Sequence, residues 1–470
     1  MKRISVVWRL AFSFVIGLVV LSLLSGCAST GGGELSGASP AKAKNIILLI
    51  GDGMGPSHFG AAWLYSTRVL GKELRMVELM RRGRTAYMVN DTADAIVPES
   101  AAAASQMATG EKMTARAVSV AADRKTPVKT ILEIAKEKGL AAGLVTTSRI
   151  TDATPAAFAA HVAYRSDEEA VAVQELQAGV DVLLGGRKQF FLPASAGGKR
   201  QDGRDLVEEA RQAGYAVVGD AAGLKAASGS KILGLFNMGN LAYEIDRTKT
   251  AEPSLAEMAA KTLEILSRNP KGFFAMIEGG RIDHAAHRND AAGTIHEVLA
   301  FDAAVGVALD FQRQDPNTLL IVTADHDTGA MALVGGGRTS KGYGGNELAA
   351  IQKVQTSFEV MAGELGKNPA PEQIREVVKK HMAIDLTEDE ARTAAGETVC
   401  KLGPAPAHHE VPALHGLAFV LRSYLGVGWG SQTHTASPLM LFGSGPGSEE
   451  LVGFRHNTEV FRLMRAALGG

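Results

Sequence analysis

Carboxylate and imidazole side chains lie next to the ends of several apolar runs in this chain, where they could bind metal ions. The set consists of Asp52, Glu278, Asp283, His287, Asp325, His326 and His434. One aspartate after a strand is usually a turn or cap residue, and one histidine is usually an ordinary hydrogen-bonded side chain. So many of them at one edge of a sheet would instead concentrate negative charge, which is costly unless cations neutralise it. Mixed aspartate and histidine ligation suits zinc, whereas ligation by oxygen alone suits magnesium.

The spacing within two of these motifs sets geometric conditions for sharing an ion. Asp283 and His287 are four residues apart, so one helical turn would place both on the same face. Asp325 and His326 are adjacent, and adjacent side chains of a regular strand point to opposite faces. This second pair can reach one ion only if the chain curls where the strand ends, so taken alone it is the weaker indication.

A serine that precedes a run of alanines is a candidate nucleophile. In VPESAAAASQMATG (97–110), a turn at residues 97–99 leads into a helix, because alanine strongly favours helix. Ser100 then lies at the helix N-terminus, where free amides and the helix dipole favour an anion. A serine in that place is most often only an N-cap. Beside a site with two metal ions it becomes a candidate nucleophile, since a metal ion lowers the cost of forming the alkoxide.

An arginine in TTSRITDATPAAFAAHVAYR (146–165) is a candidate phosphate ligand. We expect Asp152, Thr154 and Pro155 to begin a helix, with Arg165 about three turns further along. Arg165 could be an ordinary surface arginine. Next to a serine and two zinc ions it could instead hold two phosphoryl oxygens in the fork of its guanidinium.

Apolar runs that alternate with helical patterns predict the elements that position these residues. We expect strands over NIILLI (45–50), LAAGLVT (140–146), DVLLGG (181–186), YAVVG (215–219), FFAMIEGG (273–280) and TLLIVTADH (318–326). We expect helices over 126–139, with Thr126 and Pro127 as cap and first turn, over 204–214, and within about 289–313. Strands buried on both faces and joined by helices predict an α/β fold, a doubly wound and mostly parallel sheet sandwiched by helices. Ligands of such sheets gather beyond the carboxyl ends of the strands.

Residues 335–430 interrupt this alternation and predict a mainly helical insertion before the motif that contains His434. The clearest helices are EQIREVVKKHM (372–382) and LTEDEARTAAGE (386–397), and LAFVLRS (417–423) is expected to be a strand. The alternative is that this stretch simply continues the main domain.

The start of the chain has the layout of an export signal followed by a tether. A cationic beginning precedes an apolar stretch at residues 10–24 that is short for a membrane span. Leu24-Ser25-Gly26-Cys27 resembles the bacterial lipobox, in which the cysteine is acylated and becomes the first mature residue; an ordinary signal peptide is the alternative. We therefore expect a lipoprotein signal peptide over 1–26, a flexible tether rich in Gly, Ser and Ala over 27–44, and a catalytic domain over 45–470.

This layout predicts a protein that is exported and anchored by lipid to the bacterial cell envelope, in the periplasm or at the cell surface. Ala28, the residue after the cysteine, favours the outer membrane. With Cys27 acylated, Cys400 would be a single free thiol, because the chain has 2 cysteines.

The composition is that of a soluble globular chain and excludes several classes of protein. The 470 residues include 49 Lys+Arg and 50 Asp+Glu, with 46% hydrophobic residues. Disordered chains, collagens, coiled-coil rods and disulfide-stapled miniproteins are excluded. The near-zero net charge argues against a nucleic-acid-binding surface.

Taken in order along the chain, the motifs resemble those of the alkaline phosphatases. The matching segments are GDGMG (51–55), ESAAAASQMATG (99–110), TDATPAAFAAHV (151–162), EGGRIDHAAH (278–287), TADHDTG (323–329) and HTA (434–436). They span nearly the whole mature chain. Several motifs in family order are far more specific than any one of them, since GDGMG alone would be a weak signal.

The resemblance implies two zinc ions and one magnesium ion as cofactors. It assigns Asp283, His287 and His434 to the first zinc and Asp52, Asp325 and His326 to the second. It makes Asp52 a bridge to the third ion, usually magnesium, together with Thr154 and Glu278, while Asp152 acts on that ion through water. It makes Ser100 the nucleophile and Arg165 the phosphate clamp.

The activity implied by the resemblance is the hydrolysis of small phosphate monoesters in two steps. Ser100 attacks phosphorus in line to give a phosphoserine, and water then attacks that intermediate, so configuration at phosphorus is retained overall. Two zinc ions would stabilise the attacking and leaving oxygens. Family members often form homodimers, and a homodimer is therefore an expected assembly.

Two residues depart from the best-known bacterial members of the family. Glu99 stands where those members have aspartate, and its extra length could loosen or shift Arg165. His284 stands where some members have lysine, and it could tune phosphate release or the third metal site.

Two other functions fit parts of the pattern. A sister activity such as phosphodiesterase, sulfatase or phosphoglycerate mutase would keep the fold and the metals. Sulfatases modify a Cys or Ser in a C/S-x-P-x-R setting, which Ser100 lacks, and Arg165 favours a monoester. A non-catalytic surface lipoprotein that binds metal or phosphate would be expected to lack the nucleophile or a ligand, and none is missing.

Overall fold

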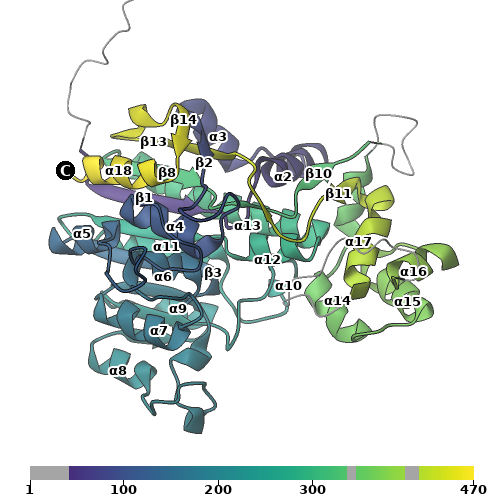
Figure 1. Cartoon of the computed structure of the whole chain (residues 1–470), viewed down its shortest axis with the longest axis horizontal. Coiled ribbons are helices and arrows are strands. Elements are labelled where there is room, and N and C mark those ends of the chain that lie inside the picture. Colours follow the sequence, from purple (N-terminus) through teal and green to yellow (C-terminus); the bar gives the residue numbers. More distant parts are fainter. Residues whose placement is uncertain (1–41, 336–345, 397–411) are drawn as a thin grey trace, which may run out of the picture. The chain divides into compact units, whose positions relative to one another are not determined.

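A ten-stranded sheet runs through the computed structural model of the chain (Figure 1). The structure describes residues 42–335, 346–396 and 412–470. The predicted signal peptide, the lipobox with Cys27, and Cys400 lie outside these residues.

The strands of this sheet alternate with helices along the chain, as predicted. They are β1 (Asn45–Ile50), β2 (Arg84–Val89), β3 (Ala141–Arg149), β4 (Val182–Gly186), β5 (Ala216–Val218), β6 (Ile232–Leu235), β7 (Phe273–Glu278), β8 (Thr318–Thr323), β13 (Leu439–Ser444) and β14 (Gly453–His456). Their order is β14-β2-β13-β8-β1-β7-β3-β4-β6-β5. Within this sheet β13 pairs antiparallel with β2 and β8, and the other pairings are parallel. The mostly parallel α/β sheet is confirmed.

Helices cover both faces of the sheet. They are α2 (Pro56–Arg68), α3 (Arg75–Arg82), α4 (Ser100–Thr109), α5 (Ile131–Glu137), α6 (Ala153–Ala159), α7 (Glu168–Gln177), α8 (Leu206–Gln212), α9 (Ala221–Ala226), α10 (Glu244–Arg247), α11 (Leu255–Leu266), α12 (Arg281–His287), α13 (Ala291–Gln314) and α18 (Thr458–Ala467), with short 3-10 turns η1 (Lys188–Phe190), η2 (Ala194–Ala196) and η4 (Ser448–Glu450).

Two neighbouring aromatic residues of β7 show how the two layers attach. Phe274 contacts Phe158 of α6, with ring centroids 5.7 Å apart, and Phe273 contacts Phe311 of α13 at 5.5 Å. Because adjacent side chains of a strand point to opposite faces, α6 and α13 lie on opposite sides of the sheet. Helix α4 packs against α6, and α11 packs against α13.

Helix α13 is the one described helix that is long and apolar enough to cross a membrane. In its most apolar window 72% of the residues are buried inside the protein. Its apolar residues therefore pack in the interior of the protein against the sheet.

The stretch predicted as an insertion is helical where the structure describes it. It contains η3 (Glu347–Lys353), α14 (Phe358–Leu365), α15 (Pro371–Met382), α16 (Glu388–Ala394) and α17 (Pro412–Leu425). These helices share an apolar cluster with residues of α2 and α13, and two short antiparallel ladders lead into and out of them. The ladders pair β10 (Met331–Leu333) with β11 (Val427–Trp429), and β9 (Asp327–Thr328) with β12 (His434–Thr435).

Two local predictions were wrong. The expected strand at 417–423 lies inside α17, where Leu417, Leu421 and Leu425 are buried at helical spacing while Phe419 is exposed. A short apolar run does not distinguish a strand from a buried helix. The helix expected from Thr126 begins instead at Ile131, because Thr130 and Glu133 form a reciprocal capping box.

Candidate active site

The register of the central strands brings the predicted carboxylates to one edge of the sheet. β1 lies between β7 and β8, and Ile50 pairs with Glu278 on one side and Thr323 on the other. Asp52 and Asp325 each follow their strand by two residues, so three carboxyl groups meet at the carboxyl edge. All three are buried. This is the edge at which parallel sheets bind their ligands.

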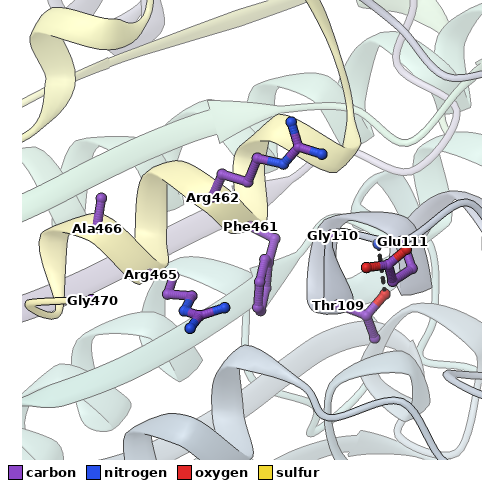
Figure 2. Close-up of a pocket in the computed structure, with 8 residues that line it drawn as sticks. All are labelled: Thr109, Gly110, Glu111, Phe461, Arg462, Arg465, Ala466 and Gly470. Atoms are coloured by element: carbon purple, nitrogen blue, oxygen red, sulfur yellow. Dashed lines mark hydrogen bonds between the residues drawn. The ribbon is translucent and has the colours of Figure 1, made fainter.

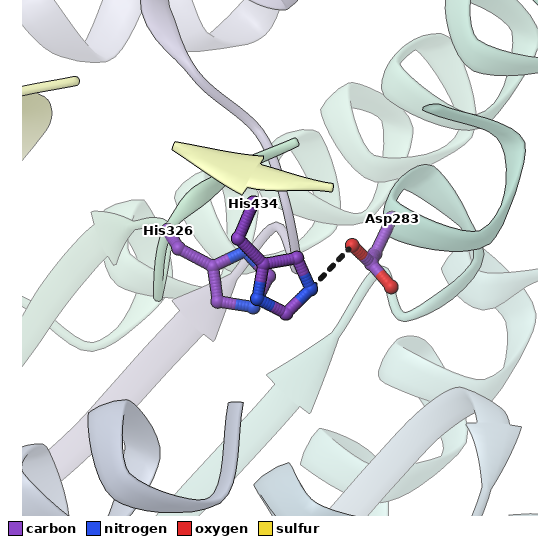
Figure 3. A group of neighbouring side chains, drawn as sticks. All are labelled: Asp283, His326 and His434. Atoms are coloured by element: carbon purple, nitrogen blue, oxygen red, sulfur yellow. Dashed lines mark ion pairs between the residues drawn. The ribbon is translucent and has the colours of Figure 1, made fainter. Parts of the chain in front are cut away.

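Two groups of ligand atoms form at this edge. Asp52, Asp325 and His326 make one, and Asp283, His326 and His434 make the other, with the ligand atoms of each group within 4.8 Å of one another (Figure 3). His287 adjoins the second group, since its Nε2 lies 3.0 Å from His434 Nε2 and 3.3 Å from Asp283 Oδ1. His326 is thus shared, and its ring stacks on that of His434 at 3.6 Å between centroids.

Both geometric conditions set by the spacing are met. α12 contains Asp283 and His287 and places them side by side. β8 ends at Thr323, so Asp325 and His326 leave the regular strand, and His326 Nε2 comes within 3.2 Å of Asp325 Oδ2.

Backbone carbonyls orient two of the imidazoles. His287 Nδ1 lies 2.6 Å from the Gln432 carbonyl, and His434 Nδ1 lies 3.0 Å from the Pro98 carbonyl. A carbonyl oxygen only accepts, so each Nδ1 carries the hydrogen. The Nε2 atoms are then left as acceptors, which is the form that binds a metal ion.

Burial raises the pKa values of three carboxylates at this edge. Burial raises the pKa of Asp52 well above its usual range, and the Asp325 carboxylate raises it further. Burial also raises the pKa of Glu278 to about 8 and that of Asp325 to about 6. Asp52 Oδ1, Asp325 Oδ2 and Glu278 Oε2 have no hydrogen-bond partner among the described residues. Divalent cations would satisfy these oxygens, so the donor set fits metal ions.

A further pair of oxygens fits a third ion. Thr154 Oγ1, in the first turn of α6, is buried, and like Glu278 Oε2 it has no hydrogen-bond partner in the described part of the chain. Asp152 caps α6 and accepts from Ser148 Oγ at 2.7 Å and from Arg149 Nη2 at 2.6 Å. Burial opposes its ionisation, but Arg149 and Arg165 hold its pKa well below the usual range.

Ser100 is the first residue of α4 but does not cap it, so the reading of this serine as an N-cap is wrong. The cap is Glu99, whose carboxylate accepts from the Ala101 and Ala102 amides at 3.1 and 2.8 Å. The Ser100 hydroxyl lies 3.2 Å from His326 Nε2, next to the ligand groups. Its side chain is therefore available for chemistry.

Arg165 lies next to Glu99, the N-cap of α4, and is not part of a helix. α6 ends at Ala159, so the helix does not extend to Arg165 as expected. Its Nη1 and Nη2 donate to Glu99 Oε2 and Asp152 Oδ1, each at 2.9 Å. Burial disfavours the charged guanidinium, but these two carboxylates raise its pKa. The longer Glu99 thus reaches Arg165 and pairs with it.

Sequence reasoning missed two contributors to the site. Thr328 Oγ1 donates to Asp283 Oδ1 at 2.6 Å and lies 3.2 Å from His326 Nδ1, so it joins the two ligand groups; its place in TADHDTG was an available signal. Arg281 is fully buried and pairs with Glu359 of α14 at 2.9 Å. No sequence pattern connects these two residues.

His284 lies next to Asp283 but is engaged elsewhere. Its Nδ1 accepts from Arg281 Nη1 at 2.9 Å, and burial, reinforced by the Arg281 charge, holds its pKa well below the usual range. The imidazole is therefore neutral at physiological pH.

A surface cavity of about 320 Å³ lies at the other end of α4 (Figure 2). It is formed by the last turn of α4 and by α18, with Phe461, Arg462 and Arg465 among its lining residues. None of the predicted catalytic residues or metal ligands lines it.

Comparison with known proteins finds similarity over nearly the whole described chain. The family model for alkaline phosphatase matches residues 43–469. Alkaline phosphatase 4 of Bacillus subtilis (strain 168) is 32% identical over 439 residues, which cover 90% of this chain and 89% of the relative. Streptomycin-6-phosphate phosphatase of Streptomyces griseus is 38% identical over 359 residues, covering 66% of this chain and 79% of the relative. The crystal structure of Thermus thermophilus alkaline phosphatase matches with a TM-score of 0.84 and 34% identity, over 94% of this chain and 96% of that one.

Proposed function

Because the chain belongs to the alkaline phosphatase family, we propose that it hydrolyses phosphate monoesters through a phosphoserine formed on Ser100. The single observation that carries this proposal is the position of the Ser100 hydroxyl. It lies 3.2 Å from Nε2 of His326, which belongs to both groups of candidate ligand atoms. Glu99 caps α4, so the Ser100 hydroxyl does not serve as the cap.

The residues at the sheet edge fit divalent metal ions, and we assign them to three sites. Asp283, His287 and His434 would hold one zinc ion, and Asp52, Asp325 and His326 a second. Thr154, Glu278 and Asp52, together with Asp152, would hold magnesium. When bound, these ions would neutralise the charge that develops on the phosphoryl oxygens and lower the pKa of the attacking hydroxyl.

Ser100 Oγ attacks phosphorus in line with the leaving oxygen. As the serine ester forms, Ser100 releases its hydroxyl proton to solvent and the bond between phosphorus and the leaving oxygen breaks. The released alkoxide takes a proton from solvent. Water then attacks the phosphoserine, and inorganic phosphate leaves with Ser100 restored. Two inversions give net retention at phosphorus. The N-terminus of α4 favours the extra negative charge on Ser100 in both steps.

Arg165 binds the phosphoryl group during both steps. Its guanidinium uses one N–H each for Glu99 and Asp152, and an arginine has five N–H donors. The remaining donors can hold two phosphoryl oxygens in a fork. The two carboxylates fix the plane of the guanidinium, so less rotamer entropy is lost when phosphate binds.

Hydrolysis of three nitrophenyl esters tests this function. The purified protein would be assayed on p-nitrophenyl phosphate, its bis-ester and its sulfate, before and after chelation and with zinc added back. We expect fast monoester cleavage that chelation abolishes and zinc restores. Preference for the bis-ester or the sulfate would assign the site to a sister activity of the superfamily. Inertness on all three with zinc bound would contradict catalysis.

We further propose the domain layout and location that the sequence predicts. Residues 1–26 would be a lipoprotein signal peptide and 27–44 a tether from a lipidated Cys27 to a catalytic domain over 45–470, with 335–430 inserted in it. The protein would be exported to the bacterial cell envelope and form a homodimer. The lipobox pattern supports export and lipidation, and the homodimers that family members often form support the proposed assembly.

A further inference from the structure

Arg116 is an exposed arginine that the backbone holds beside the phosphate clamp. Its N–H donates to Glu99 Oε1 at 2.7 Å, and its carbonyl accepts from the Arg165 N–H at 2.9 Å. The other oxygen of the same Glu99 carboxylate lies 2.9 Å from Arg165 Nη1. One carboxylate therefore contacts both the Arg116 backbone and the Arg165 guanidinium, which places Arg116 at the rim of the catalytic site.

The backbone at Arg116 has a conformation that glycine would adopt more readily. Its φ is +67°, in the left-handed region, where non-glycine residues are uncommon and mildly strained. Arg124 braces the loop, because its Nη1 donates to the Ala163 carbonyl and its Nη2 to the Ala115 carbonyl, at 2.8 and 2.9 Å. Such strain persists where surrounding contacts over-determine it, and it concentrates at functional sites.

The guanidinium of Arg116 is not engaged by any residue that the structure describes. Arg165 pairs with two carboxylates and Arg124 with two carbonyls. The Arg116 side chain makes no ion pair or hydrogen bond with any residue in the described ranges. An exposed guanidinium with its donors free readily binds carboxylate or phosphate oxygens.

We propose that Arg116 binds a second anionic group, a carboxylate or a further phosphate, carried by the leaving group of the substrate. The proposal rests on the proposed phosphatase function, since it places this contact next to the phosphoryl group that Arg165 holds. An arginine side chain is long enough to extend from this rim over the alcohol portion of a bound ester. The enzyme then favours monoesters whose alcohol is itself anionic.

A matched pair of substrates tests the proposal. Glycerol phosphate and phosphoglycerate share a three-carbon leaving group and differ by one carboxylate. The variant Arg116→Gly removes the side chain, keeps the N–H and carbonyl that contact Glu99 and Arg165, and suits the left-handed backbone. Arg462→Gln, on α18 in the cavity of Figure 2, removes one exposed positive charge far from Ser100 in the chain and serves as the control.

We expect Arg116→Gly to lower the ratio of kcat/KM for phosphoglycerate to that for glycerol phosphate by about fivefold, through KM. Arg462→Gln should keep the wild-type ratio. High salt should reduce the wild-type preference, because the Debye length falls to about 3 Å at 1 M. An unchanged ratio in Arg116→Gly, or an equal loss on both substrates, would overturn the proposal. If the wild-type protein cleaves p-nitrophenyl phosphate but neither of these esters, the proposal fails. If it cleaves none of the three with zinc bound, the phosphatase function itself fails.

Discussion

At the scale of single residues, the environment of Ser100 separates it from the other serine of α4. Ser105 is also buried, but its hydroxyl accepts the Ser119 amide hydrogen at 2.9 Å and is thereby occupied. Ser100 faces His326 instead. The two serines share a helix and differ in what their oxygens contact, so they make a matched pair for mutation.

We predict that Ser100→Ala abolishes the phosphoenzyme while leaving zinc binding nearly intact. Loss of a catalytic nucleophile typically lowers kcat by roughly 10³-fold or more. Acid-quenched incubation with radiolabelled substrate would measure the phosphoserine, and metal analysis would measure bound zinc. Ser105→Ala should still form the phosphoenzyme, although its loss of a buried hydrogen bond costs about 1–3 kcal/mol of stability. Near-normal turnover in Ser100→Ala would rule out the serine assignment.

Glu297 provides a residue-scale prediction outside the active site. It is buried in α13, its Oε1 accepts the Glu244 amide hydrogen at 2.6 Å, and burial raises its pKa to about 8. The unfolded chain releases this proton near pH 4.3. Between about pH 4.3 and pH 8 the unfolded state binds fewer protons than the folded state. The contribution of protonated Glu297 to the free energy of unfolding is therefore full below about pH 4.3, and it is lost as pH rises through 8.

We predict that Glu297→Gln flattens this part of the pH dependence of unfolding. The amide has almost the same shape, can accept the same hydrogen bond, and does not ionise. From pH 5 to pH 9 the variant should gain stability relative to the wild type, by on the order of 3 kcal/mol. Urea unfolding at several pH values measures the difference. Parallel curves for the two proteins would show that Glu297 does not titrate in this range.

At the scale of elements, an ion pair between buried Arg281 and solvent-exposed Glu359 connects the helical insertion to α12, the helix of two candidate ligands. Arg281 begins α12, which contains Asp283 and His287 two and six residues later. Its guanidinium pairs with Glu359 of α14 and lies 3.7 Å from the centre of the Tyr243 ring. Arg288, just after α12, also pairs with Glu359, at 3.1 Å. The insertion therefore braces the helix that presents two candidate ligands.

We predict that Glu359→Gln destabilises the protein by about 1–2 kcal/mol, because it leaves the buried Arg281 charge without its carboxylate. This value lies between those of exposed pairs and of broken buried pairs, since Glu359 is partly exposed. In the double variant with Arg281→Met, the effect of Glu359→Gln should largely disappear. Denaturant unfolding of the four proteins gives the coupling energy. Strict additivity would contradict a direct role for this pair.

At the scale of the whole molecule, the lipobox pattern at Leu24–Cys27 leads to a prediction about location. One acyl chain gives only marginal membrane binding, whereas two give stable anchoring. We predict that Cys27→Ala moves the protein from the membrane fraction to the soluble fraction, while its specific activity on p-nitrophenyl phosphate stays the same. Fractionation and immunoblotting of the producing bacterium measure this. A variant that remains with the membranes would contradict lipidation at Cys27.

The sequence by itself determined the fold class and the residues able to carry the chemistry. Continuous apolar runs such as 45–50 and 318–323, alternating with helical patterns, indicate strands covered on both faces, and parallel strands share a carboxyl edge. Asp52, Glu278 and Asp325 follow such runs, and they meet in the structure for that reason. The four-residue spacing of Asp283 and His287 is a local property of a helix and was likewise predictable.

The tertiary structure alone decided the contacts between segments far apart in the chain. Local patterns could not distinguish helix from strand at 417–423, nor Thr126 from Thr130 as a cap, because burial and capping partners make those choices. The same holds for Ser100 beside His326, Glu99 reaching Arg165, and Glu359 covering Arg281. These pairs are 226, 66 and 78 residues apart, and they form only when the packing of the whole chain brings the segments together, which no local spacing encodes.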